Sequence, residues 1–383
     1  MSSDAPETGR SAAGAPTWLV VAGGGTGGHV LPGIAVAREL VARGHDPATI
    51  HFIGADRGPD RDLVTTAGFP VTVLPGRGIQ RRATLENLGA ALALVRGALR
   101  GARLERRLRP AVVLSVGGYA SVGGTLGAVL TRTPLVVTEQ NARASLANRL
   151  AGRFAVACAV PVAGTNLPRA TVTGNPVRPE VIAAASADRD AARRALGVPP
   201  GRMLVAVMSG SLGARRVNAA VIDAVARLAD RGDLWVHHVV GRRDWGTEHA
   251  PPPRLPEGAA VGYRAVEYEA DSGRLLAAAD VLVGRAGGSV AELAVVGVPA
   301  ILVPLPGAPA DHQTANARAL VDAGAAVLVP DGECDGARIA AELTALLDAP
   351  ARRSAMADAA RRLGRPDAAA RVADLVEEHA RRG

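Results

Sequence analysis

The chain contains no lysine, although it is strongly basic. Its 383 residues include 44 Lys or Arg side chains, all of them Arg, against 36 Asp or Glu, which gives a formal net charge of +8. Such a surplus suits partners with anionic groups, such as phosphorylated ligands or an acidic membrane. Aromatic residues make up only 2% of the chain, so the interleaved basic and aromatic pattern of single-strand binders is missing. We therefore expect no nucleic acid among the partners.

Cysteine and long apolar runs are scarce as well. Cys158 and Cys334 lie far apart, and neither they nor the carboxylates show metal-ligand spacing, so we expect a reducing compartment, no metal and no cofactor. No window holds about 18 consecutive apolar residues, so no transmembrane helix is predicted. Residues 1–16 are polar and lack the apolar core of a signal peptide, which indicates a disordered tail.

What the chain does have is glycine placed where apolar strands end. An apolar run leads into the stretch 23–29 (GGGTGGH), and a helical pattern follows. A strand, a glycine loop and a helix in this order form a turn that binds phosphate or sugar at the end of a parallel strand. The spacing of Gly23, Gly25 and Gly28 also fits the dinucleotide fingerprint, and Asp56 follows the second predicted strand. A nicotinamide-dependent oxidoreductase therefore stays open at this point.

Strand and helix patterns alternate along the chain in two series. Apolar runs predict strands over 18–22, 48–53, 71–74, 112–116 and 135–138, and then over 203–208, 236–240, 281–284, 300–304 and 326–329. Between the series, 173–179 contains two prolines and a glycine, which suggests a linker. Such alternation predicts parallel doubly wound sheets, and hence an α/β chain of two Rossmann-like domains.

The linker and the two series give the expected domain boundaries. We expect a tail over 1–16, an N-terminal Rossmann-like domain over 17–175 and a C-terminal one over 176–350. The helical segment 351–383 could pack back on the first domain.

Polar residues follow a strand of the second series. Gly287, Gly288 and Ser289 come after the strand over 281–284 and begin a helix that carries Glu292 one turn in. A helix N-terminus supplies N–H donors to a diphosphate without needing a metal. The Glu292 carboxylate could accept both hydroxyls of a ribose, or it could only stabilise the first helical turn.

Seven short motifs occur in order along the chain. They are Gly24 to Gly33, Gly117-Gly118-Tyr119, Glu139-Gln140-Asn141, Gly174 to Arg178, Gly210 to Ala214, Arg285-Ala286-Gly287 with Glu292, and Asp311-His312-Gln313 with Asn316. In order and approximate spacing they resemble the MurG family, bacterial UDP-N-acetylglucosamine transferases that complete lipid II for peptidoglycan. The resemblance runs from about residue 17 to about residue 375. Each motif alone is weak, but seven in order are specific.

The resemblance implies a GT-B fold, in which two Rossmann-like domains flank a cleft. It also implies inverting transfer of N-acetylglucosamine from UDP-N-acetylglucosamine to undecaprenyl-pyrophosphoryl-muramyl-pentapeptide. The residues expected to bind the donor are Thr26, Gly27, Gly28, Asn141, Arg178, Ser211, Gly287, Gly288, Ser289, Glu292 and Gln313. On the acceptor side we expect Tyr119, Glu139 and Gln140.

His29 is the candidate general base. Inverting sugar transfer requires a group that takes a proton from the acceptor hydroxyl while UDP departs. At a helix start the dipole disfavours an imidazolium, so the ring stays neutral and able to accept a proton. The alternative is that His29 only orders the glycine loop.

The chain departs from the family pattern at several positions. Thr138 stands where the family usually has His, Ser272 stands where it tends to have Met, and Val122 follows Ser121 in place of Pro. The segment 287–292 is one residue shorter. These differences keep three alternatives open: a paralogous glycosyltransferase with another acceptor, a non-catalytic UDP-sugar-binding subunit, and an epimerase of the same fold.

Basic and apolar residues indicate contact with a membrane. The loop 76–82 carries Ile79 among arginines, and the helix predicted over 85–99 is followed by more arginines up to Arg107. This composition fits a peripheral protein on an anionic surface, at the cytoplasmic face of the cell membrane. The arginines equally fit a solvated helix face.

Overall fold

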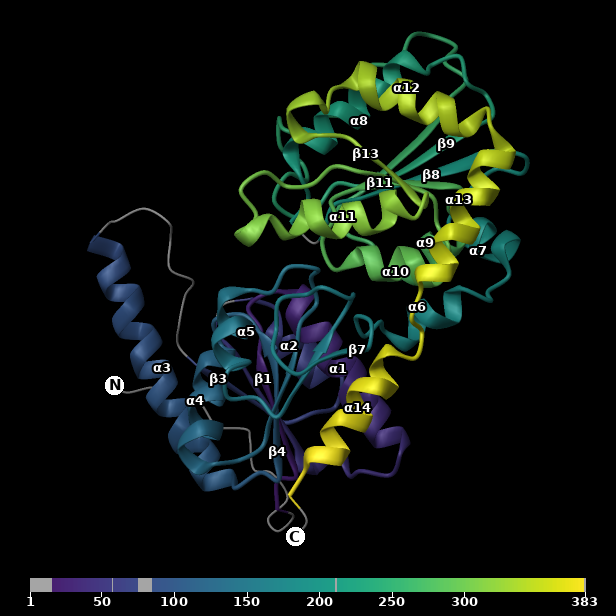
Figure 1. Cartoon of the computed structure of the whole chain (residues 1–383). Helices are drawn as coiled ribbons and strands as arrows, with labels where there is room; N and C mark the ends of the chain where they lie inside the picture. The colour runs from purple at the N-terminus through teal and green to yellow at the C-terminus, as the bar shows by residue number, and fades with distance from the viewer. Residues whose placement is uncertain (1–15, 57, 75–84, 211, 382–383) are drawn as a thin grey trace, which may run out of the picture. The chain divides into compact units, whose positions relative to one another are not determined.

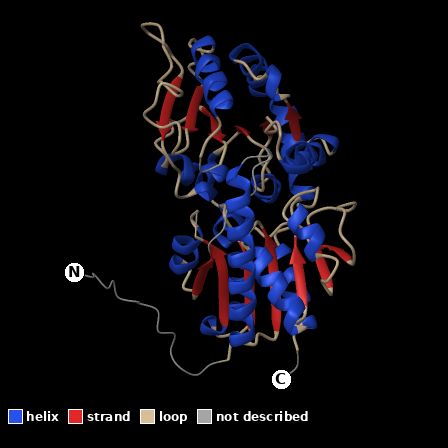
Figure 2. Cartoon of the chain, turned by 90° about the vertical axis from the view of Figure 1, so that its left-hand side faces the viewer, coloured by secondary structure: helices blue, strands red, loops and turns tan. Residues whose placement is uncertain are grey.

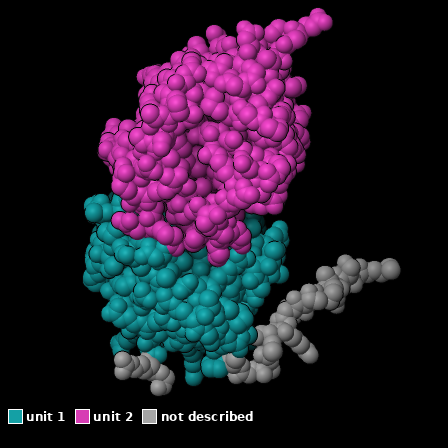
Figure 3. Space-filling view, turned by 90° about the vertical axis from the view of Figure 1, so that its right-hand side faces the viewer, with its two compact units in different colours: residues 1–140, 144–176, 367–383 teal, residues 141–143, 177–366 magenta. Residues whose placement is uncertain are grey.

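The computed structural model describes residues 16–56, 58–74, 85–210 and 212–381, with the backbone alone over 85–94. These residues form two compact units (Figure 3). The first unit includes residues up to 140, 144–176 and those from 367 on, and the second includes 141–143 and 177–366. Apart from the short segment 141–143, the chain enters the second unit after Pro176 and leaves it after Pro366.

The first unit is built on a sheet of seven parallel strands in the order β3-β2-β1-β4-β5-β6-β7. The strands are β1 (Leu19–Gly23), β2 (Ile50–Ala55), β3 (Val71–Leu74), β4 (Val112–Gly117), β5 (Leu135–Thr138), β6 (Ala157–Val160) and β7 (Ala170–Val172). β1 and β4 are buried along their whole length because helices cover both faces of a parallel sheet. Leu19 and Val21 face one core cluster, while Val20 and Ala22 face the other.

Helices pack on both faces of this sheet (Figure 2). They are α1 (Gly27–Ala42), α2 (Asp60–Thr66), α3 (Leu85–Leu108), α4 (Ser121–Thr131), α5 (Leu146–Ala151) and α14 (Ala368–His379). The C-terminal helix α14 lies beside α1 (Figure 1). Arg43, just past the end of α1, pairs with Asp374 and Glu377 at 2.7 Å each, so the last helix is tied to the first by charge as well as by apolar packing.

The second unit has six parallel strands in the order β10-β9-β8-β11-β12-β13. They are β8 (Met203–Met208), β9 (Leu234–Val239), β10 (Gly262–Val266), β11 (Val281–Gly284), β12 (Ala300–Leu302) and β13 (Ala326–Leu328). The helices are α6 (Pro179–Ala184), α7 (Arg189–Ala195), α8 (Arg215–Arg227), α9 (Ser272–Ala278), α10 (Ser289–Val296), α11 (His312–Asp322), α12 (Gly336–Leu347) and α13 (Pro350–Leu363). The predicted architecture of two α/β units with parallel sheets is confirmed.

Several boundaries differ from the sequence expectation. β6, β7 and β10 were not predicted, and α1 begins at Gly27, well before the apolar helical pattern. The C-terminal segment divides: α13 packs on α10 in the second unit, and the chain joins the first unit only from Asp367, not from 351. The expected tail lies outside the described residues except for its last one. No helix in the described part of the chain is long and apolar enough to cross a bilayer.

Candidate active site

The glycine stretch of the first unit follows β1, and the carboxylate of Asp60 holds it in place. The N–H of Gly25 donates to Asp60 Oδ2 at 2.7 Å, and the N–H of Ala55 donates to the same oxygen at 2.8 Å. Gly24 has a φ of 146°, and a Cβ there would overlap the Asp60 carboxylate. Position 24 therefore requires glycine, because the anchoring carboxylate occupies the side-chain space.

The sequence did not reveal Asp60 as part of this site. It is the first residue of α2 and is fully buried. Burial raises its pKa, and the two backbone N–H groups oppose that shift. In the sequence, an Asp at a helix start is readily explained by the helix dipole. Its contact with a loop 35 residues away has no signature in the local sequence, so it could not be predicted.

Thr26 and His29 come together at the beginning of α1. Thr26 precedes the helix, Gly27 and Gly28 are its first two residues, and Thr26 Oγ1 lies 2.9 Å from His29 Nδ1. The His29 ring also faces the end of β4, since a Cβ on Gly117 would lie 3.3 Å from His29 Cδ2. The His29 ring is partly exposed. The structure thus brings this predicted group together at the ends of two central strands.

Of the three residues predicted on the acceptor side, one packs on the glycine loop and the other two are buried. Tyr119 packs on the glycine loop, since a Cβ on Gly25 would lie 2.9 Å from Tyr119 Cε1. Glu139 and Gln140 are buried. The Glu139 carboxylate accepts hydrogen bonds from the backbone N–H of Gln140 at 3.0 Å and from Asn148 Nδ2 at 2.9 Å. These contacts shape the loop after β5 without any ligand.

Arg178 and Glu292 form an ion pair in the second unit. Arg178 caps the start of α6, and its NH2 group lies 3.1 Å from Glu292 Oε1 on α10. The same NH2 group donates to Ser272 Oγ at 2.6 Å. Two side chains predicted to bind the donor are therefore in contact with each other, and a third side chain joins them.

The loop before α10 presents the helix N-terminus predicted to bind a diphosphate. Gly287, Gly288 and Ser289 are partly exposed, and Gly288 is the N-cap residue of α10. Val290 N and Ala291 N donate to Gly287 O and Gly288 O at 3.2 Å each, so the loop offers a ligand the N–H groups that precede Val290.

Asn316 organises the polar residues around this loop. Its Nδ2 donates to Ala286 O and to Asn141 Oδ1, both at 3.1 Å, and its Oδ1 accepts from Ala142 N at 2.8 Å. Gln313, one turn earlier on α11, accepts from Leu305 N at 2.9 Å. Asn141 thus belongs to the hydrogen-bonded group around Asn316, whereas Gln313 holds the loop after β12.

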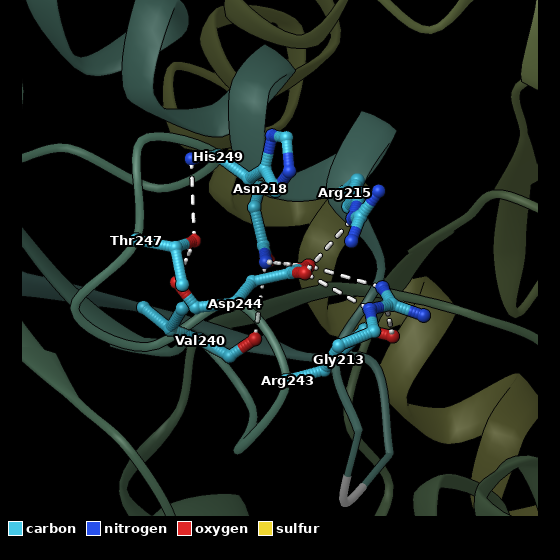
Figure 4. A network of polar contacts seen from close by, with 8 residues as sticks. All are labelled: Gly213, Arg215, Asn218, Val240, Arg243, Asp244, Thr247 and His249. Carbon is cyan, nitrogen blue, oxygen red and sulfur yellow. Dashed lines mark hydrogen bonds and ion pairs between the residues drawn. The ribbon is translucent and has the colours of Figure 1, made fainter.

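A buried carboxylate, Asp244, also supports the second glycine loop at Gly213 (Figure 4), because it binds Arg243, whose NH2 group donates to Gly213 O at 3.3 Å. Asp244 is fully buried and binds Arg243 through both oxygens at 2.9 and 3.0 Å. Arg215, at the start of α8, donates to Asp244 Oδ1 at 3.1 Å, and Asn218 donates to Oδ2 at 3.2 Å. Hydrogen bonds from Arg243 and Arg215 lower the pKa of Asp244. The predicted donor residue Ser211 lies outside the described residues.

Family models match most of the chain. The N-terminal domain of glycosyltransferase family 28 matches residues 19–160, and the C-terminal domain of the same family matches residues 204–372. The chain belongs to glycosyltransferase family 28.

Curated relatives of this family 28 glycosyltransferase match over nearly their whole length. A protein of Anaeromyxobacter sp. (strain Fw109-5) is 41% identical over 377 residues, covering 95% of this chain and 94% of its own. A protein of Stutzerimonas stutzeri (strain A1501) is 39% identical, covering 94% and 98%. Both are named UDP-N-acetylglucosamine--N-acetylmuramyl-(pentapeptide) pyrophosphoryl-undecaprenol N-acetylglucosamine transferase.

Solved structures agree with this assignment. The crystal structure of Acinetobacter baumannii MurG is 26% identical, with a TM-score of 0.71, and covers 94% of this chain and 99% of its own. A UDP-GlcNAc 2-epimerase from Neisseria meningitidis is 14% identical, with a TM-score of 0.66 and coverage of 94% and 99%, so it shares the fold alone. The fold is GT-B, and the enzyme is a glycosyltransferase rather than an oxidoreductase.

Within the described residues, no group of three or more His, Cys, Asp or Glu side chains could hold a metal ion.

The functional residues that could not be found from the sequence are those that hold other site residues in place. Asp60 and Asp244 hold the two glycine loops, and Ser272 holds Arg178. Each acts through a contact with a residue distant in the chain or through a buried hydrogen bond.

Proposed function

We propose that the chain transfers N-acetylglucosamine from UDP-N-acetylglucosamine to undecaprenyl-pyrophosphoryl-N-acetylmuramyl-pentapeptide, with inversion at the anomeric carbon. The observation that carries this proposal is identity near 40% over almost the entire length of relatives with that printed activity. The glycine loops of both units and the His29 site are the parts such a reaction needs.

The proposed roles follow from where the side chains lie. The N-terminus of α10 at Gly287, Gly288 and Ser289 would stabilise the departing diphosphate through N–H groups. Glu292 would accept the ribose hydroxyls. In the first unit, His29 would remove the proton from the acceptor hydroxyl as its oxygen bonds to the anomeric carbon and UDP leaves.

The remaining predicted residues would complete the two binding surfaces. Thr26, Gly27, Gly28 and Asn141 would contact the donor sugar or the reacting centre, and Gln313 and Ser211 would contact the donor. Tyr119 is the described side chain best placed to meet the acceptor, because it packs on the glycine loop. Thr138 is fully buried, and its hydroxyl has no hydrogen-bond partner among the described residues, so it offers no substitute for an exposed histidine.

One assay tests the reaction against its alternatives. The protein is incubated with labelled UDP-N-acetylglucosamine and either the lipid-linked muramyl-pentapeptide or a panel of small aglycones. Transfer to the lipid-linked acceptor supports the proposal, and transfer only to another aglycone indicates a paralogue. An altered UDP-sugar formed without acceptor indicates an epimerase, and UDP binding without any turnover indicates a binding subunit.

Replacing Glu292 with Ala should weaken donor binding. Loss of hydrogen bonds to a charged carboxylate is worth about 1.5–3 kcal/mol, so we expect the donor KM to rise at least about tenfold. The kcat at saturating donor should change much less, since the ribose lies away from the reacting bond. Steady-state kinetics with varied donor measure both values, and an unchanged KM would remove the ribose assignment.

We also propose that the protein works as a peripheral protein on the anionic cytoplasmic face of the cell membrane. The loop 76–82 lies outside the described residues, but α3 carries exposed Val95 and Leu99 next to exposed Arg96 and Arg100. This combination of apolar and basic side chains suits the interface of an anionic bilayer.

A second stripe of the same kind runs along α5 and the turn that follows it. Leu146, Leu150 and Phe154 recur every four residues and are 69, 50 and 61% exposed. Arg149 and Arg153 lie between them. Both are exposed, and neither forms an ion pair with another of the described residues. α4 contacts both α3 and α5, so the two stripes belong to one layer of helices. Single exposed apolar residues are ordinary, but a regular stripe with cations is not.

Replacing Leu146 and Phe154 together with Ser should reduce binding to phosphatidylglycerol vesicles. Each side chain contributes about 1.5–3 kcal/mol when it leaves water, so we expect at least a tenfold loss of partitioning in a vesicle sedimentation assay. Leu255→Ser, at an exposed apolar position in the second unit, is the control and should behave like the wild type. Equal binding by the double variant would exclude this stripe from the membrane contact.

A further inference from the structure

Ser272 occupies a position that no part of the reaction described above explains. It is the first residue of α9, is 8% exposed, and its Oγ accepts a 2.6 Å hydrogen bond from Arg178 NH2. The same Arg178 nitrogen lies 3.1 Å from Glu292 Oε1. A single guanidinium nitrogen is thus shared between a hydroxyl on α9 and a carboxylate on α10.

The packing of α9 on α6 makes this contact possible. Gly273 lies against the backbone of α6, since a Cβ at this position would be 2.8 Å from Glu180 O. The close approach brings Ser272 next to Arg178, which caps α6. The serine hydroxyl therefore lies next to a point where α9 and α6 pack closely.

The guanidinium has few other anchors. Arg178 Nε is buried and has no hydrogen-bond partner among the described residues, so the hydroxyl of Ser272 and the carboxylate of Glu292 determine its position. The ion pair engages Glu292 Oε1, which leaves Oε2 for other acceptor contacts. A carboxylate with one oxygen held by a fixed guanidinium has a restricted orientation.

We infer that Ser272 is a positioning residue of the donor site: it holds Arg178 against Glu292 and thereby orients the carboxylate toward the ribose hydroxyls of a uridine diphosphate. This inference rests on the proposed function, because Glu292 is assigned to the ribose there. It gives Arg178 a role in the donor site that it performs through Glu292, by orienting the carboxylate.

The test compares the binding of UDP with that of 2′,3′-dideoxyuridine diphosphate, which lacks the hydroxyls in question. For Ser272→Ala, calorimetry should show UDP affinity lowered about tenfold, the scale of a lost hydrogen bond to a charged group. Affinity for the dideoxy ligand should change less than about twofold. Ser272→Thr keeps the hydroxyl and should restore most of the UDP affinity.

Two further variants keep the test decisive. Ser186→Ala removes an exposed serine just after α6 and should bind both ligands like the wild type. Arg178→Lys keeps the charge but removes the planar guanidinium, and it should show the same selective loss, so it carries the test if Ser272→Ala does not fold.

The outcomes separate this inference from the proposed function. If the wild type does not bind UDP, the proposed function fails. If the wild type binds UDP and Ser272→Ala weakens both ligands equally, Ser272 has only a structural role and the inference is overturned. Unchanged UDP affinity in both Ser272→Ala and Arg178→Lys would overturn it as well.

Discussion

Replacing His29 with alanine is expected to lower kcat by about 10²–10⁴-fold, the usual contribution of a general base. UDP affinity should stay within about twofold of the wild type, because the proposed uridine contacts belong to the other unit. The imidazole stands in the first turn of α1, partly exposed and next to the end of β4, where a hydroxyl group can approach it.

The contact with Thr26 explains why this imidazole suits the role. A neutral histidine accepts a proton on one nitrogen only while the other carries its own hydrogen. If His29 Nδ1 donates to Thr26 Oγ1 across the observed 2.9 Å, then Nε2 is the nitrogen that accepts the proton. In that tautomer the contact with Thr26 holds the ring and leaves Nε2 as the proton acceptor that general-base chemistry requires.

Kinetics with varied acceptor, together with UDP calorimetry, measure the effect of His29→Ala. His249→Ala, in an exposed loop of the second unit, is the matched control and should leave both quantities unchanged. A wild-type kcat in His29→Ala would remove the residue from the mechanism. A parallel loss of UDP affinity and of kcat would instead indicate that His29 orders the glycine loop.

The fold could be predicted from the sequence at most strands where burial leaves a continuous apolar run, and the buried strand β6 is the exception. β1, β4 and β8 are buried strands rich in Val and Leu between helices, and such runs stand out. β7 has all three residues exposed, and β10 is only partly buried, so neither shows an apolar pattern. These edge strands are defined by pairing with a neighbour, which local composition does not encode.

The same limit applies to the start of α1. Five glycines and a threonine over residues 23–28 favour a loop, yet the helix already begins at Gly27. Helix propensity argues against this start. The Asp60 carboxylate, by holding Gly25, fixes the direction in which the chain enters the helix, and this tertiary contact outweighs the local preference.

Site residues divide in a similar way. His29 and Glu292 could be named in advance because each follows a strand within a recognisable motif. The contacts that support the site could not: Ser272 reaches Arg178 across 94 residues, and Asn316, although it belongs to a motif, reaches Ala142 across 174. Nothing in the local sequence around a serine or an asparagine indicates such a contact, so only the packing of the helices on the sheet reveals it.

Replacing Glu105 with glutamine should stabilise the first unit at neutral and alkaline pH. Glu105 lies on α3, is fully buried, and neither carboxylate oxygen has a hydrogen-bond partner among the described residues. Its side chain fills the space left by two glycines of α4, since a Cβ on Gly124 or Gly127 would crowd the carboxylate. The carboxyl group is thus enclosed between two closely packed helices.

Burial raises the pKa of Glu105 from 4.5 to about 9, and the sign of the pH dependence follows. Below pH 4.5 the carboxyl is neutral in both the folded and the unfolded chain, so it imposes no penalty. Between pH 4.5 and about 9 the unfolded chain ionises and the folded chain does not. Stability therefore falls as pH rises, by up to about 1.4 kcal/mol per pH unit.

Glutamine has nearly the same shape and does not ionise, so Glu105→Gln should remove this slope. At pH 8 we expect the variant to be more stable than the wild type by about 3 kcal/mol, the order of magnitude that the linkage allows. At pH 4.5 the two should differ by less than about 1 kcal/mol, because both side chains are then neutral amide or acid groups in the same cavity.

Urea denaturation of the two proteins at several pH values between 4.5 and 8 measures this difference. Glu248→Gln, at an exposed glutamate, is the control and should follow the wild-type pH dependence throughout. Both substitutions replace a glutamate with glutamine, one at a buried position and one at an exposed position. If the pH dependence of the free energy of unfolding is lost in Glu105→Gln and kept in Glu248→Gln, it arises from the carboxyl between α3 and α4. Parallel curves for the wild type and Glu105→Gln would mean that Glu105 ionises without cost, and so that α3 separates from α4 readily enough to admit water.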